Sequence, residues 1–212
     1  MLPVATRAKV PISLESGDHL TREEFHRRYS MRPDIKKAEL VEGVVFVPSP
    51  VRHDLHGMPH FLVITWLGSY VASAPGVEPG GDNSTVFLEG GNEVQPDAFL
   101  WRPEDQLALQ TEDGYIVGPP HLIVEIAASS VSYDLHEKKE AYRRNGVPEY
   151  IVWRVLDEAI DWFRLQDGQY VLIERDADGL IEGEQFPGLR LHVPSMLAGD
   201  LAAVLARLHG TS

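Results

Sequence analysis

Two acidic residues lie inside segments whose pattern predicts buried strands. Asp97 directly precedes the apolar run 98–100, and Glu125 lies in the middle of LIVEIAA. A buried charge costs several kcal/mol unless it is paired or binds a metal ion. A structural salt bridge or a hydrogen-bonded core glutamate is one interpretation of these carboxylates. The other is a pair of metal ligands.

A lysine on the following predicted helix supplies a third group. Asp134, Lys138 and Tyr142 are spaced four residues apart, which places them on one helical face. An ammonium beside two carboxylates is the set that a metal-dependent phosphodiesterase needs. The carboxylates hold Mg²⁺ or Mn²⁺, the metal activates a bound water, and the lysine positions that water or stabilises the transition state. A solvated helix face with an ordinary ion pair is the alternative, and Lys139 could substitute on a rotated helix.

Three histidines form a competing motif. His53, His56 and His60 have the spacing i, i+3, i+7, which is compatible with zinc ligands on one helical face. Pro59 argues against a regular helix through all three. We therefore expect a structural or surface role for His56 and His60.

Periodicity and turn signals predict the elements that position these residues. Helices are predicted at 21–29, 53–74, 134–145 and 194–209, with the second beginning regularly at Pro59. Two short strands around Gly43, or one strand with a bulge there, are predicted within 39–47. Further strands are predicted at 85–88, 94–100, 121–128, 149–155, 159–165 and 169–175. The long polar loop 102–118 has the length of a functional or mobile segment. This order of elements predicts an α/β or α+β fold.

Length and composition limit the class of protein. The chain has 212 residues, of which 43% are hydrophobic, and we expect an N-terminal arm at 1–19 followed by a single domain at 20–212. The absence of cysteine excludes disulfides, thiolate metal sites and cysteine nucleophiles. No apolar run reaches the roughly 20 residues that span a bilayer, and the start lacks a signal peptide pattern. We expect a cytoplasmic protein.

Charge and motif content narrow the function. The 32 acidic and 19 basic residues give a formal charge of −13, which disfavours non-specific phosphate binding at long range. A local basic patch or a bridging metal ion can overcome the repulsion between this negative charge and a phosphate. The sequence contains no G-x-S-x-G, P-loop or G-x-G-x-x-G motif, so serine hydrolase, nucleoside triphosphatase and dinucleotide enzyme are unsupported.

Several segments, taken in order, resemble one protein family. They are QPDAFLW, LIVEIAASS, the D-x3-K-x3-Y pattern from Asp134, and GVPEYIVW, with ELVEG at 39–43, SPVRH at 49–53 and FPGLRLHV at 186–193. Together they are similar to the Uma-type family of the PD-(D/E)xK nuclease superfamily, over roughly residues 20–205. The resemblance implies a restriction-endonuclease-like core, in which helices flank a central mixed β-sheet.

The resemblance also implies roles for individual residues. Asp97 matches the aspartate of the PD element, and Glu125 matches the acidic residue of the E-x-K element. The lysine position of that element is Ala127 here, so its role passes to Lys138 on the next helix. Glu39 matches a family glutamate and is a further candidate metal ligand.

Accessory residues and a function follow from the same resemblance. His53 matches a family histidine, Asp134 and Tyr142 are accessory candidates, and His121 stands where relatives tend to carry an acidic residue. The implied activity is Mg²⁺- or Mn²⁺-dependent hydrolysis of nucleic-acid phosphodiesters, with DNA as the expected substrate, by a homodimer without a membrane partner. The alternative is a catalytically degenerate nuclease fold that acts as a protein-binding scaffold, for which the acidic charge is the main support.

Overall fold

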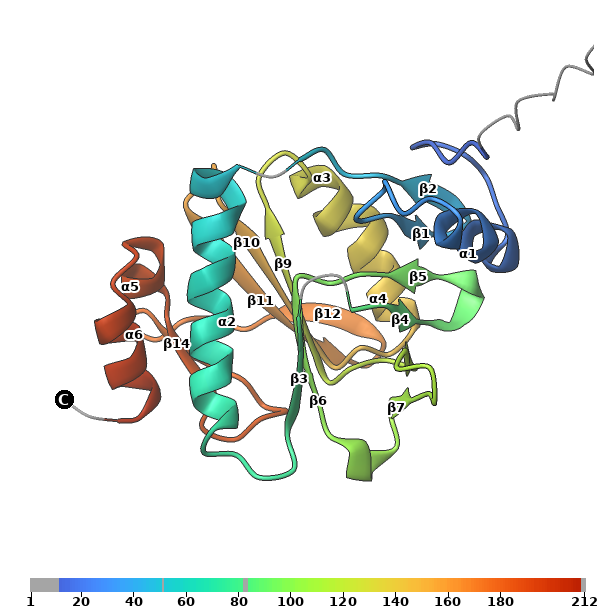
Figure 1. Cartoon of the computed structure of the whole chain (residues 1–212). Helices are drawn as coiled ribbons and strands as arrows, with labels where there is room; N and C mark the ends of the chain where they lie inside the picture. Colours follow the sequence, from blue (N-terminus) through green and yellow to red (C-terminus); the bar gives the residue numbers. More distant parts are fainter. Residues whose placement is uncertain (1–11, 51, 82–83, 211–212) are drawn as a thin grey trace, which may run out of the picture.

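The computed structural model describes residues 12–50, 52–81 and 84–210 (Figure 1). Within them the chain forms two six-stranded sheets, a small two-stranded sheet and flanking helices. The predicted mixed α and β architecture is therefore confirmed. The sequence had indicated one central sheet, and the second six-stranded sheet is an addition to that expectation.

The central sheet is mixed. Its strands in spatial order are β12 (Gln169–Leu172), β11 (Ala159–Gln166), β10 (Glu149–Arg154), β9 (Leu122–Ala127), β6 (Ala98–Trp101) and β3 (Glu78–Gly81). β9 and β10 are parallel, and the other neighbours are antiparallel. Every residue of β9 is buried, as its apolar sequence predicts. The predicted meander corresponds to β10, β11 and β12.

One face of this sheet is covered by helix α2 (Met58–Val71), which runs across it in Figure 1. Trp66 on α2 meets Trp162 of β11 edge-to-face, with ring centroids 5.9 Å apart. The same core contains residues of the C-terminal elements, namely β13 (Leu180–Glu182), β14 (Arg190–His192), α5 (Val193–Leu197) and α6 (Leu201–Leu208). Pro59 occupies the first turn of α2, as predicted, and a π-helical turn, η1 (His53–Gly57), precedes it.

The opposite face is covered by a continuous helical segment made of α3 (Val131–Tyr133), the π-helical turn η4 (Asp134–Lys138) and α4 (Lys139–Arg144). Ala141 and Tyr142 of α4 pack in one core with Ile123 and Ala127 of β9. The predicted helix therefore begins at Val131, three residues earlier than expected, and contains a π-helical turn at Asp134–Lys138.

The second sheet lies beside this helical segment (Figure 1). Its strands in spatial order are β2 (Val44–Phe46), β1 (Glu39–Val41), β5 (Glu93–Val94), β4 (Val86–Phe87), β8 (Ile116–Val117) and β7 (Leu109–Gln110). β1 and β2 form the expected pair around Gly43, which has a φ of 78°. β7 and β8 occupy the polar loop 102–118, which also contains a 3₁₀ turn, η3 (Pro103–Asp105). Another 3₁₀ turn, η2 (Glu89–Gly91), links β4 and β5.

A small third core fixes the N-terminal part of the chain. Helix α1 (Arg22–Ser30) begins at Thr21, whose side chain accepts a hydrogen bond from the backbone N–H of Glu24, as the capping-box spacing predicts. Leu14 packs with Phe25 and is 3% exposed. Residues 12–19 of the expected arm thus lie against the domain, and residues 1–11 lie outside the described part. Among the described residues, no helix has the length and apolar character needed to cross a membrane.

Further elements differ from the expectations. The predicted strand 94–100 is two strands, β5 in the second sheet and β6 in the central sheet, and Pro96, which has no backbone N–H for a strand ladder, lies between them. The sequence EPGG of β3 does not look like a strand, yet it pairs with β6 because Gly80 lies against the ring of Phe99, where a β-carbon would collide. The predicted C-terminal helix is two helices. They separate at Gly199, which has a φ of 71°, and Asp200 caps the second by accepting a hydrogen bond from Ala203.

Candidate functional site

The three candidate metal ligands come from three strands or strand ends. Glu125 lies in the middle of β9, on the same face as Ile123 and Ala127 and toward the helical segment. Asp97 directly precedes β6, the neighbour of β9, and Glu39 begins β1 of the second sheet. All three residues are at most 3% exposed. The two sheets thus bring buried carboxylates toward one region between them.

Lys138 links two of these carboxylates. Its Nζ atom lies 2.6 Å from Oε1 of Glu125 and 2.9 Å from Oε1 of Glu39, and 4.0 Å from Oδ1 of Asp134. Lys138 is 2% exposed although it carries a charge. The predicted juxtaposition of Asp134, Lys138 and Glu125 is therefore present, and the lysine is enclosed by the carboxylates.

Asp97 has a separate set of partners. Lys37 approaches its Oδ1 atom with Nζ at 2.9 Å, while His56 lies 3.2 Å from Oδ2 and the backbone N–H of Ile126 donates to Oδ2 at 2.8 Å. The ring of His60 makes a 2.9 Å hydrogen bond with the backbone carbonyl of Asp97. Asp97 is thus contacted by residues of η1 and α2, of the neighbouring strand β9, and of the segment before β1.

Hydroxyl groups complete the surroundings of the carboxylates. Tyr142 donates a 2.7 Å hydrogen bond to Oε1 of Glu125, and Ser130 donates a 2.6 Å bond to Asp134. The ring of Tyr133 lies 5.9 Å from Nζ of Lys138, and its buried hydroxyl has no hydrogen-bond partner among the described residues. Tyr133 therefore supplies a polar atom at the edge of the cluster that a bound group could use.

The carboxylates of this cluster have unequal proton affinities. Burial and the charges of Asp97 and Asp134 raise the pKa of Glu125, although Lys138 opposes the shift. Burial raises the pKa of Asp134 to about 6. Burial acts in the same direction on Asp97, but the hydrogen bond from His56 and the charge of Lys37 hold its pKa well below the ordinary range. Asp97 is thus the firmly ionised carboxylate of the cluster.

The two lysines are permanent cations. Burial alone would lower the pKa of Lys138, yet Glu125 and Glu39 raise it well above its ordinary value. Asp97 and Glu39 likewise raise the pKa of Lys37 against the effect of burial. Four carboxylates therefore surround two ammonium groups. This excess of negative charge raises the pKa values of both lysines.

The donor chemistry of the cluster fits a hard divalent cation. Carboxylate oxygens are the ligands that Mg²⁺ and Mn²⁺ prefer, and Glu39, Asp97 and Glu125 supply them without competing sulfur ligands. In the conformation of the described chain, no three His, Asp or Glu side chains converge closely enough to enclose a metal ion, because lysines lie between the carboxylates. A cation bound here would therefore replace ammonium contacts.

The structure also shows site neighbours that the sequence analysis missed. Lys37 and His56 contact Asp97, whereas the predicted accessory His53 is exposed at the start of η1. The sequence signal for Lys37 is its position two residues before Glu39. For His56 the signal was the histidine spacing, which was assigned a structural or surface role.

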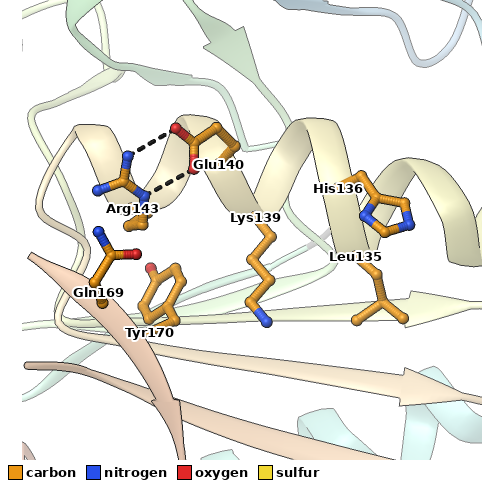
Figure 2. A pocket seen from close by; sticks show the side chains of 7 residues that line it. All are labelled: Leu135, His136, Lys139, Glu140, Arg143, Gln169 and Tyr170. Carbon is orange, nitrogen blue, oxygen red and sulfur yellow. Dashed lines mark hydrogen bonds and ion pairs between the residues drawn. The ribbon is translucent and has the colours of Figure 1, made fainter.

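Lys139, the suggested substitute for Lys138, points elsewhere. Its Nζ atom lies 3.3 Å from the centroid of the Phe163 ring. It lines a pocket of about 440 Å³ between the helical segment and β12, where Figure 2 shows it beside Tyr170 and Arg143. The two adjacent lysines therefore point in different directions from the helix, and of the two Lys138 reaches the carboxylates.

The mixed sheets flanked by helices form a fold of the restriction-endonuclease-like class. Residues 22–194 match the Uma2 family, whose description is "putative restriction endonuclease", and the chain belongs to this family. A crystal structure of a "putative nuclease belonging to DUF820" from Anabaena variabilis has the same fold, with a TM-score of 0.66 and 14% sequence identity. The alignment covers 85% of this chain and 98% of that chain. Comparison with curated proteins finds no match.

Proposed function

We propose that the protein is a divalent-metal-dependent endonuclease that hydrolyses nucleic-acid phosphodiester bonds, with DNA as its substrate. The observation that carries this proposal is the excess of buried carboxylates over cations between the two sheets. Burial favours protonation of Glu125 and Asp134, and a divalent cation would hold these carboxylates in the ionised form in place of protons. Membership of the Uma2 family supports the same activity.

The side chains have distinct roles in this proposal. Asp97 and Glu125 hold Mg²⁺ or Mn²⁺, and Glu39 is a further ligand. When bound, the cation activates a water molecule and neutralises charge that develops on the phosphate. Lys138 keeps Glu39 and Glu125 together and is the cation nearest to them, consistent with the role of assisting the water that the sequence predicts. Tyr142 and Asp134 fix the geometry of Glu125 and Lys138.

Cleavage of nucleic acid tests the activity. The full chain is incubated with supercoiled plasmid, single-stranded DNA and RNA in Mn²⁺ or Mg²⁺ at low salt, because the charge of −13 opposes approach of a polyanion. Nicking should occur, and it should stop with a chelator and in an Asp97→Asn/Glu125→Gln variant. Asp54→Asn, which removes an exposed carboxylate, is the matched control and should cleave like the wild type. Cleavage that survives in the double variant would contradict the assigned site.

Metal binding gives a second readout that needs no substrate. Calorimetric titration with Mn²⁺ should show saturable binding to the wild type and to Asp54→Asn, and none to the folded double variant. Thermal melts of each variant establish that it is folded. Equal binding by all three proteins would place the metal elsewhere.

A scaffold is the second candidate function. The specific observation in its favour is that lysines already contact Glu39, Asp97 and Glu125, so the cluster is partly neutralised without a metal. A scaffold should bind no Mn²⁺ and cleave none of the three substrates. The homodimer and the cytoplasmic location that the sequence predicts remain predictions. Light scattering of the purified chain would measure its oligomeric state.

A further inference from the structure

The two lysines of the carboxylate cluster differ in access to solvent. Lys138 has a side chain that is 2% exposed, whereas the side chain of Lys37 is 21% exposed. Carboxylates surround the ammonium of Lys138, and the rings of Tyr133 and Tyr142 lie about 6 Å from it. A phosphate of a polymeric substrate cannot approach an enclosed ammonium without disrupting these pairs. The cation at the accessible edge of the cluster is Lys37.

The backbone holds Lys37 firmly at this edge. Its neighbour Ala38 is fully buried in the small core that also contains Phe25 and Leu40. Lys37 precedes Glu39 by two residues, and the charges of Asp97 and Glu39 both act on its ammonium. The 2.9 Å contact with Asp97 then directs the ammonium toward the carboxylates.

We infer that Lys37 contacts the scissile phosphate, and that it transfers from Asp97 to a phosphate oxygen when substrate binds. This inference rests on the proposed nuclease function and deepens it. An ammonium on a flexible stem suits this exchange, because it binds phosphate as a point charge and has no fixed hydrogen-bond geometry to break. In this arrangement Lys138 organises the glutamates, and Lys37 is the substrate-contacting cation.

Adjacent lysines offer a matched comparison. Lys36 carries the same charge one residue earlier, is exposed, and donates to the backbone carbonyl of Pro33 at 2.9 Å. Lys36→Met and Lys37→Met therefore change the net charge of the protein equally. Any difference between the two variants reports the position of Lys37 at the cluster.

The experiment measures cleavage, Mn²⁺ affinity and melting temperature of the wild type and of both variants. Lys37→Met should cleave roughly 100-fold more slowly, as expected when a group that stabilises transition-state charge is lost. Its Mn²⁺ affinity should stay the same or rise, because Asp97 loses a competing cation. Lys36→Met should cleave within about threefold of the wild type, because the ammonium of Lys36 is exposed to solvent screening and contacts the carbonyl of Pro33, not the carboxylate cluster.

Three results would overturn the inference. If Lys37→Met cleaves as fast as Lys36→Met, Lys37 does not contact the phosphate, although the nuclease function stands. If Lys37→Met loses Mn²⁺ binding together with cleavage, Lys37 only supports Asp97. If the wild type cleaves no nucleic acid, whether or not it binds Mn²⁺, the proposed function fails and the inference fails with it.

Discussion

The Nζ atom of Lys138 lies 2.6 Å from Oε1 of Glu125, and both side chains are almost completely buried. The contact joins the helical segment to the central strand of the main sheet. Glu39 receives the same ammonium at 2.9 Å, so one lysine connects three elements. The pair therefore contributes to the fold as well as to the candidate site.

Removal of this ammonium should destabilise the protein strongly. Lys138→Met leaves buried carboxylates without their cation, which costs about 3–5 kcal/mol. Lys139→Met removes the same charge from the next residue and loses only a contact with the Phe163 ring, which is worth about 1 kcal/mol. Urea denaturation at neutral pH measures both free energies of unfolding. Equal losses for the two variants would show that the buried cluster does not depend on Lys138.

The hydroxyl of Tyr142 should also matter for stability. Tyr142→Phe removes the 2.7 Å hydrogen bond to Glu125, and bonds to charged groups contribute about 1.5–3 kcal/mol. Tyr170→Phe is the matched control, because its hydroxyl donates to the neutral carbonyl of Val147 at 2.9 Å, a bond worth about 1 kcal/mol. Thermal and urea denaturation should rank the first variant below the second. The reverse order would mean that Glu125 gains little from the hydroxyl.

His121 gives a prediction about pH. Its buried ring accepts from the backbone N–H of Arg102 at 3.3 Å and lies 3.0 Å from Asp105. Burial and the charge of Arg102 lower the pKa of His121 below its ordinary value of 6.5. The folded protein thus favours the neutral ring, and the corresponding stability is present above pH 6.5 and is lost as the pH falls through the folded-state pKa.

The measurement is the free energy of unfolding between about pH 5 and 7. As the pH rises through this range, the raised pKa values of Glu125 and Asp134 contribute a loss of stability, and the lowered pKa of His121 contributes a gain. His121→Gln should reduce this gain, because glutamine has no titrating ring. His209→Gln, at an exposed histidine that makes a 3.0 Å hydrogen bond with Ser69, is the control for the loss of an imidazole. A slope that is the same in all three proteins would assign the pH dependence to other groups.

Gly80 and Gly81 give a test of the edge strand. A β-carbon on Gly80 would fall within the ring of Phe99, so Gly80→Ala should cost about 1–3 kcal/mol through overpacking. A β-carbon on Gly81 would lie 3.7 Å from Ile64, an ordinary contact, and alanine there should be neutral or stabilising by about 0.5–1 kcal/mol. Differential scanning calorimetry compares the two. If both variants melt like the wild type, β3 does not pack on β6 in solution.

Local pattern was sufficient for most of the fold. The capping-box spacing at Thr21 located α1, Gly43 marked the hairpin of β1 and β2, and the apolar run around Glu125 identified β9 as a strand buried on both faces. Each of these features depends on residues within a few positions of one another. Gly80 is the contrast. Its place in β3 depends on the ring of Phe99, which leaves no room for a β-carbon and which approaches Gly80 only in the folded protein.

The candidate site was predictable where charge conflicted with burial. Asp97, Glu125 and the spacing of Lys138 stand out against their apolar surroundings. Lys37 and His56 do not, because each lies in a polar segment and reaches Asp97 only through the packing of separate elements. The contacts of Lys37 and His56 with Asp97 join residues far apart in the sequence, so no local sequence pattern predicts them.

Two π-helical turns border the carboxylate cluster. His56 belongs to η1 and contacts Asp97, while Lys138 ends η4 and contacts Glu125. A π turn contains one residue more than an α turn, so each segment depends on an exact chain length. Loss of one residue from either turn would rotate the side chains before it by roughly 100° relative to the helix that follows. In evolutionary terms, a substitution in η1 or η4 keeps this register, whereas an insertion or deletion there would move His56 or Lys138 away from its carboxylate in a single event.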